Sequence, residues 1–269
     1  MAEKETKNEP KDLIEAVPEE LEKLEIVKTE ESENMLNEKL KQLDKTEKKR
    51  YSYEKREVSA WAPKTKLGHL VKEGKIKSID EILSSGKVIL EAEIVDALLP
   101  LESDLLSIGQ AKGKFGGGKR RAWRQTQRKT MEGNVVTFSC MAVVGDRNGH
   151  VGIGYGKAKE TLPARAKALR KARLNIIKIT RGFETQEEKS AFPHTVPFVV
   201  EGKCGSIRIK LIPAPRGTGL VIGDQGKKVL ILAGIDDVYA VTKGQTRSTF
   251  NVAKAIIDAL QKTNKVILK

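Results

Sequence analysis

The chain has 269 residues, with 50 Lys and Arg against 36 Asp and Glu, which gives a formal net charge of +14. Its two cysteines, Cys140 and Cys204, lie far apart without partners at metal-ligand spacing, so the sequence supports neither a disulfide framework nor a zinc site. No apolar run reaches the roughly 18 residues of a membrane span, and the Glu/Lys-rich start lacks the apolar core of a signal peptide. We therefore expect a protein of the reducing cytoplasm that contacts no membrane.

The charge is distributed unevenly along the chain. Residues 1–60 contain 13 basic and 17 acidic residues, so the other 209 contain 37 basic and 19 acidic ones. An excess this large favours a nucleic-acid partner. Residues 1–58 alternate Glu with Lys and have few apolar side chains, which predicts a disordered leader. Two weak leucine stripes in it could instead form helices that dock on a partner.

Residues 59–110, which we call the lead-in, have a sequence pattern that predicts helices. Helical signals cover 78–83 and 91–99, where Ser78 and Asp80 are possible caps and Pro100 is a stop.

A basic, glycine-rich insertion follows at 111–122. Between Lys112 and Lys129 the chain has eight Lys or Arg and no acid, with Phe115 and Trp123 among them. Such a segment cannot bury itself, so it is either a solvated loop or an arm that binds polyanion.

Residues 123–186 predict a sheet covered by a basic helix. The strand 135–144 leads into the hairpin turn 145–149, and Val151, Ile153 and Tyr155 then alternate with glycines. From Lys159 the period becomes helical. The expected buried stripe of this helix is Leu162, Ala166, Leu169, Ile176 and Ile177.

A polar linker, 187–193, leads to a C-terminal α/β unit, 194–269. We expect strands at 195–200, 206–212 and 237–241, with helices at 227–232 and 249–262. The chain is therefore α+β by pattern.

Two glycine motifs resemble phosphate loops. The glycines of G-H-V-G-I-G-Y-G-K, residues 149–157, fail the Walker spacing and recur every second residue, so they lie on one face of a strand. Close approach of RNA or of a neighbouring helix accounts for them better. The run G-D-Q-G, 223–226, has the form of a KH loop, but Asp224 would face phosphate. A simple strand-to-helix turn is the favoured interpretation.

No catalytic group stands out. His69, His150 and His194 are isolated from one another in sequence, without a nucleophile or carboxylate at a recognised catalytic spacing. We predict no enzyme activity, no cofactor and no metal.

Three long strings together resemble the small-subunit ribosomal protein S5 family in its archaeal form. They are V-V-G-D-R-N-G-H-V-G-I-G-Y-G-K-A-K-E from 143, K-L-I-P-A-P-R-G-T-G-L-V from 210, and L-A-G-I-D-D-V from 232. The segment W-A-P-K-T-K-L-G-H-L-V-K-E-G-K-I from 61 is similar to the lead-in of archaeal and eukaryotic members. Several long motifs in one order are far more specific than any single glycine pattern.

The resemblance implies a double-stranded-RNA-binding-like unit followed by a C-terminal βαβ unit, the S5 domain-2-like fold, whose crossover has the rare left hand. That second fold also occurs in small-molecule kinases and gyrase subunits, so fold alone does not exclude catalysis. The family implies a structural, cytoplasmic, ribosome-bound protein that binds ribosomal RNA and supports translation. Its implied neighbours are proteins S4 and S8, with messenger RNA and the decoding region nearby.

Archaeal members often carry cysteines where this chain has G-F-E-T-Q-E-E-K-S, residues 182–190, so no metal or thiol role is expected there. Two rival functions stay open at this point: a KH-like regulator of single-stranded RNA and a nucleotide-dependent kinase.

The RNA-binding residues are expected from charge and from the family motifs, within which Arg128, Lys129, Lys157 and Arg216 fall. The whole predicted set is Lys119, Arg120, Arg121, Trp123, Arg124, Arg128, Lys129, Lys157, Lys167, Arg170, Lys171, Arg216, Lys227, Lys228 and Arg247.

Overall fold

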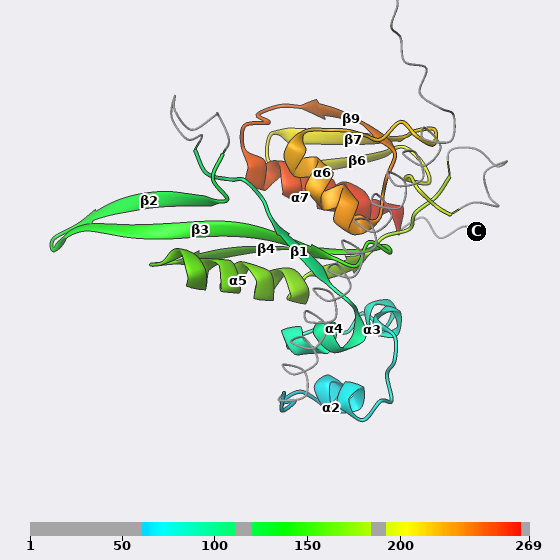
Figure 1. Ribbon diagram of the computed structural model, residues 1–269, viewed down its shortest axis with the longest axis horizontal. Coiled ribbons are helices and arrows are strands. Elements are labelled where there is room, and N and C mark those ends of the chain that lie inside the picture. Colours follow the sequence, from blue (N-terminus) through cyan, green and yellow to red (C-terminus); the bar gives the residue numbers. More distant parts are fainter. Residues whose placement is uncertain (1–60, 111–119, 184–191, 265–269) are drawn as a thin grey trace, which may run out of the picture. The chain divides into compact units, whose positions relative to one another are not determined.

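The computed structural model describes residues 61–110, 120–183 and 192–264 (Figure 1). The predicted leader, residues 111–119 of the basic insertion and most of the predicted linker lie outside the described residues. In chain order the elements are α2 (Lys66–Lys72), α3 (Ile79–Ser84), α4 (Ala92–Leu98), β1 (Glu102–Leu105), β2 (Trp123–Thr130), β3 (Gly133–Gly145), β4 (His150–Ala158), α5 (Thr161–Leu174), β5 (Ile176–Lys178), β6 (Val200–Cys204), β7 (Ile207–Pro213), β8 (Leu220–Val221), α6 (Asp224–Ala233), β9 (Val238–Lys243) and α7 (Thr249–Thr263). Within the described ranges, no helix has the length and apolar character needed to span a membrane.

The lead-in folds around a small apolar core of its own. Residues from α2, α3 and α4, including Val71, Ile82 and Ile94, pack together with Ile176 of β5. The helices expected at 78–83 and 91–99 are confirmed as α3 and α4, and Ser78 is the N-cap residue of α3. The short helix α2 was not predicted, because its seven residues contain no more than two turns of apolar pattern.

Five antiparallel strands form the first sheet, in the order β1-β3-β4-β5, with β2 pairing the outer half of β3. The predicted hairpin is confirmed: β3 and β4 are joined by a turn in which Arg147 and Gly149 have positive φ, 57° and 100°. β1 and β2 were not predicted as strands. β2 is almost entirely polar, W-R-Q-T-Q-R-K-T, so it lacks the apolar alternation that signals a half-buried strand.

Helix α5 packs closely on this sheet because glycines face alanines. A Cβ added to Gly152, Gly154 or Gly156 would lie within 2.2 Å of a backbone oxygen of α5. The facing residues are Ala164, Ala168 and Ala172, each with 0% of its surface exposed. The glycine row of β4 is therefore explained by a neighbouring helix, one of the two alternatives that the spacing left open.

The predicted buried stripe of α5 is wrong in most of its members. Leu162 is 74% exposed and Ala166 is exposed, and Ile176 and Ile177 belong to β5. Only Leu169 packs from the helix against the core beneath it, and it is half-buried. A helix that lies against a row of glycines presents small side chains, since a leucine would hold it too far away for the two backbones to meet.

The C-terminal unit has a four-stranded sheet in the order β6-β7-β9-β8, with β8 and β9 parallel and joined through α6. This is the βαβ connection that the resemblance implied. The predicted helices appear as α6 and α7, and two predicted strands as β7 and β9. The strand expected at 195–200 is wrong, because β6 begins only at Val200; Pro197, which has no N–H to donate, falls in the middle of the predicted run.

The two sheets share one hydrophobic core. The face of the first sheet opposite α5 contributes Met141, Val143 and Val151, which cluster with Leu230 of α6 and Ile256 of α7. Figure 1 shows the resulting layers: α5, the first sheet, the helices α6 and α7, and the second sheet. The inner half of β3 is therefore buried on both faces.

Candidate RNA-binding surface

The outer part of the β2–β3 hairpin has no core. None of residues 120–138 is buried, and Met131 at the tip is fully exposed. Figure 1 shows the two strands extending past the end of α5. The pairing of β2 with β3 runs without a break from Trp123 opposite Cys140 to Thr130 opposite Gly133. Backbone hydrogen bonds thus hold a ribbon whose side chains are free to contact a partner.

This ribbon carries uncompensated positive charge. Residues 120–136 contain five basic residues and one acid, Glu132. Among the described residues, no carboxylate lies within ion-pair distance of any of the five. Some cations elsewhere are paired, such as Arg147 with Glu102 (2.7 Å), Arg173 with Asp96 (3.0 Å) and Lys178 with Asp80 (2.9 Å). The hairpin cations therefore form no ion pair that would stabilise the described fold.

The strand register places these cations on both faces of the ribbon. Arg124 on β2 and Lys157 on β4 both pair with Ser139, so their side chains share one face, and Arg128 follows on that face because it is four residues on. Trp123 and Lys129 lie on the opposite face. Trp123 is 39% exposed, which leaves its ring available for stacking.

A second group of predicted residues lies on α5. Lys167, Arg170 and Lys171 are all exposed, away from the buried alanine stripe. Helical spacing of three and four places them on one solvent face. The structure thus separates the predicted cations into a hairpin set and an α5 set.

The other predicted residues are more scattered. Arg216 is exposed in the loop after β7, where Gly217 and Gly219 have positive φ. Lys227 is exposed on α6, and Arg247 is exposed between β9 and α7. Arg120 lines a cavity with the start of α6 and with Thr246, so the end of the basic insertion lies near the loop that carries Arg247. Lys119 lies outside the described residues.

Lys228 has an intramolecular role. Its ammonium contacts Asp104 at 2.8 Å and donates to the Leu105 carbonyl at 3.0 Å, which ties α6 to β1. We therefore leave Lys228 out of the proposed surface.

The G-D-Q-G motif is a strand-to-helix turn. It follows β8, and Gly223 is the N-cap residue of α6. A KH loop joins two helices, so the structure supports the favoured interpretation of this motif over the KH alternative.

Sequence reasoning missed the surroundings of His150. Its Nδ1 lies 2.6 Å from Asp146 Oδ2, and its Nε2 lies 3.0 Å from Asp80 Oδ1. The hydrogen bond with Asp146 raises the pKa of His150, burial opposes that rise, and Asp80 reinforces it. The spacing D-x-x-x-H across the hairpin turn was visible in the sequence, but Asp80 is 70 residues away. Because the group joins α3 to the β3–β4 turn, we assign it to structure.

Metal and thiol chemistry find little support. In the part of the chain that the structure describes, no three His, Cys, Asp or Glu side chains gather in a way that could hold a metal ion. Cys140 is buried, and burial raises the pKa of its thiol, which lowers its reactivity.

Comparison with known proteins agrees with the resemblance read from the motifs. Residues 122–180 match the family model for the N-terminal domain of ribosomal protein S5, and residues 202–267 match the model for its C-terminal domain. The small ribosomal subunit protein uS5 of Nanoarchaeum equitans is 48% identical over 210 residues, which is 78% of this chain and 90% of that protein. The uS5 proteins of Methanothermobacter thermautotrophicus (47%, covering 78% and 90%) and Methanospirillum hungatei (48%, covering 78% and 96%) are similarly close.

Proposed function

The chain belongs to the ribosomal protein S5 family, and from this premise we propose that it is a structural component of the small ribosomal subunit that binds ribosomal RNA. In this role it supports translation in the cytoplasm as part of a ribonucleoprotein and catalyses no reaction. The absence of catalysis follows from the family, since its named relatives are ribosomal proteins.

The observation that carries the proposal is the unpaired charge of the β2–β3 hairpin. Arg124, Arg128 and Lys129 stand on both faces of a ribbon without a core, and Arg121 is exposed just before β2 begins. Such a ribbon can enter a groove or junction of folded RNA and neutralise phosphates on both sides. Shape and phosphate contacts then dominate over base readout, with Trp123 available to stack on an unpaired base.

We extend the proposal to the exposed cations outside the β2–β3 hairpin. Lys167, Arg170 and Lys171 on α5 form a second RNA contact, and the loop with Arg216 meets RNA or a protein neighbour. We further propose that proteins S4 and S8 are neighbours, and that the chain lies near the decoding region and the path along which messenger RNA enters the subunit. These placements come from the family resemblance.

Sedimentation tests the proposal. A tagged copy of the full chain, expressed in an archaeal host, is expected to migrate with small subunits in a sucrose gradient, while a variant with Arg121, Arg124, Arg128 and Lys129 changed to Gln shifts toward the top. A chain found only at the top, bound to short unpaired RNA, would favour the KH-like regulator. Saturable ATP binding by such free chains would favour the kinase.

A further inference from the structure

Strand β4 has one edge that is only partly paired. β4 is paired with β3 from Val151 to Ala158, but β5 pairs it on the other side only at His150, Val151 and Gly152. Among the described residues, no strand covers the remaining edge, residues 153–158. An uncovered edge is a template for another extended chain.

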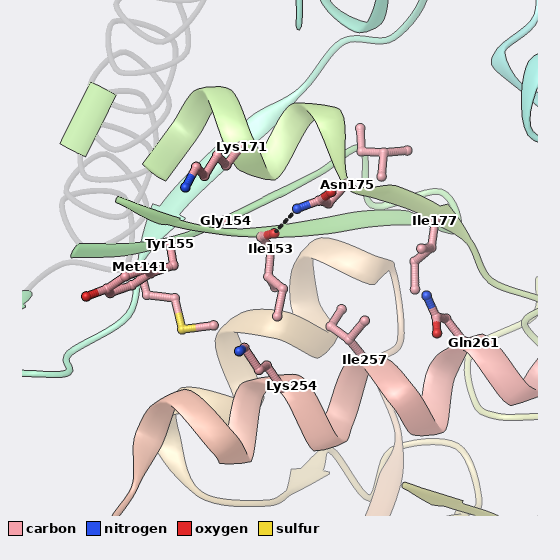
Figure 2. A pocket seen from close by; sticks show the side chains of 11 residues that line it. Met141, Ile153, Gly154, Tyr155, Lys171, Asn175, Ile177, Lys254, Ile257 and Gln261 are labelled. Atoms are coloured by element: carbon pink, nitrogen blue, oxygen red, sulfur yellow. Dashed lines mark hydrogen bonds between the residues drawn. The ribbon is translucent and has the colours of Figure 1, made fainter. Parts of the chain in front are cut away.

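The register identifies which backbone groups face this edge. The Gly149 carbonyl accepts from the Ile179 N–H at 2.7 Å, so it points away from β3. Backbone groups alternate along a strand, so those of Ile153, Tyr155 and Lys157 point the same way. The carbonyl of Ile153 agrees, since it accepts a long hydrogen bond, 3.4 Å, from the Asn175 side chain (Figure 2).

A cavity of about 470 Å³ lies directly beside the edge. Its walls come from β4, the end of α5, β5 and α7. Figure 2 shows Ile153 of β4 and Ile257 of α7 pointing into the space between the sheet and the helix. Met141 of β3 and Ile176 and Ile177 of β5 add to the apolar lining, which can accept one or two apolar side chains.

The rim of the cavity is positive. Lys171 on α5 and Lys254 on α7 line it from two sides, both are exposed, and none of the described residues that line it is acidic. Lysines beside an edge hinder pairing with a second copy of this chain, because like charges would then meet. They favour a strand that carries carboxylates.

We propose that this edge binds an extended segment of a partner protein that alternates apolar and acidic residues. Its backbone pairs with Ile153, Tyr155 and Lys157 as a sixth strand of the sheet. Its apolar side chains enter the cavity, and its carboxylates meet Lys254, while Lys171 stays with the RNA contact on α5. In this mode of recognition, main-chain hydrogen bonds supply affinity and alternate side chains supply specificity.

The test uses the full chain, labelled at isoleucine methyl groups, and a capped eight-residue peptide of alternating isoleucine and glutamate. We expect the peptide to shift the NMR signals of Ile153, Ile177 and Ile257 and to slow hydrogen exchange at the Tyr155 and Lys157 amides. Lys254→Glu is expected to weaken binding roughly tenfold. The matched control, Lys243→Glu, changes an exposed lysine of β9 that does not line the cavity, and it should leave binding unchanged.

A second pair of variants separates backbone pairing from charge. Lys157→Pro removes an N–H of the edge and is expected to abolish binding, while Lys157→Ala retains it. Equal peptide binding by Lys254→Glu and Lys243→Glu would overturn the proposal, as would the absence of any methyl shift. An eight-nucleotide oligouridylate that shifted the three methyl signals when the peptide did not would show a nucleotide site instead.

Discussion

The inner and outer halves of strand β3 have opposite surroundings. From Ser139 to Gly145 every residue is buried, between α5 on one face and α6 and α7 on the other. From Gly133 to Phe138 none is buried, and the partner strand β2 is rich in cations that form no ion pair within the described residues. The inner half stabilises the fold, while the outer half projects charge that folding does not use. The exposed cations of the outer half are therefore the better candidates for binding a partner, because they do not stabilise the fold.

The largest expected effect comes from breaking the inner half. Gly154→Val places side-chain atoms where a Cβ would already lie 2.1 Å from the Ala168 carbonyl oxygen, so α5 must move. We expect the free energy of unfolding to fall by more than about 3 kcal/mol, measured by urea denaturation.

The matched change in the outer half is Val135→Ala. Val135 is 38% exposed, so its loss should change the free energy of unfolding by no more than about 0.5 kcal/mol. Similar losses for the two variants would contradict the division of β3 into two halves.

A moderate effect on stability is expected from the hydrogen-bonded group of His150, Asp146 and Asp80, which joins α3 to the β3–β4 turn. Because the folded pKa of His150 is raised, its stabilising contribution is present below the unfolded pKa of about 6.5 and is lost as pH rises through the folded value. Burial alone would raise the pKa of Asp146, but hydrogen bonds from His150 and from backbone N–H groups lower it. Its contribution is therefore lost as pH falls through its own folded pKa.

The group should thus stabilise most at mildly acidic pH. The difference in free energy of unfolding between the native chain and His150→Gln is expected to be largest near pH 5 to 6. It should shrink as pH rises above the unfolded pKa of about 6.5 toward the raised folded pKa. The neighbouring charges are Lys178, which also contacts Asp80 (2.9 Å), and Arg147, which pairs with Glu102. A difference that stayed constant from pH 5 to 8 would show that His150 acts by packing alone.

The sequence predicted the fold where residues repeat with a clear period. The β3–β4 hairpin, its turn, α7 and the βαβ unit all appeared in the pattern or in the resemblance. The errors had physical causes. The apolar period of α5 pointed to leucines, but the glycine row of β4 selected Ala164, Ala168 and Ala172 for the interface. Strand β2 was hidden because its polar side chains carry no signal of burial.

For the candidate surface, the sequence supplied the cations but not their arrangement. Charge alone could not separate Lys228, which pairs with Asp104, from Lys227, which is exposed. Nor could it show that Arg124 and Lys157 flank the same residue, Ser139. Such relations depend on strand register, which links residues far apart in the chain.

The smallest expected effect on stability is that of Arg216→Ala. Arg216 is exposed in a loop whose turns depend on Gly217 and Gly219. We expect the melting temperature to stay within about 2 °C of the native value, since surface changes away from special features cost little. Incorporation into small subunits should fall. Unfolding of the variant would make Arg216 a structural residue and remove it from the proposed surface.

If the outer part of the β2–β3 hairpin binds RNA through phosphate contacts, the salt dependence of RNA binding must reflect its cations. The affinity of the full chain for a small-subunit RNA fragment would be measured from 50 to 300 mM salt. Changing Arg121, Arg124, Arg128 and Lys129 to Gln should lower the slope of log affinity against log salt by about 3, because each lost phosphate contact removes roughly 0.7 to 0.9. The control changes four exposed lysines of the lead-in, Lys64, Lys66, Lys77 and Lys87, and should leave the slope nearly unchanged. Equal slopes for the two variants would contradict the account, because the hairpin cations would then add only to the general field of the protein.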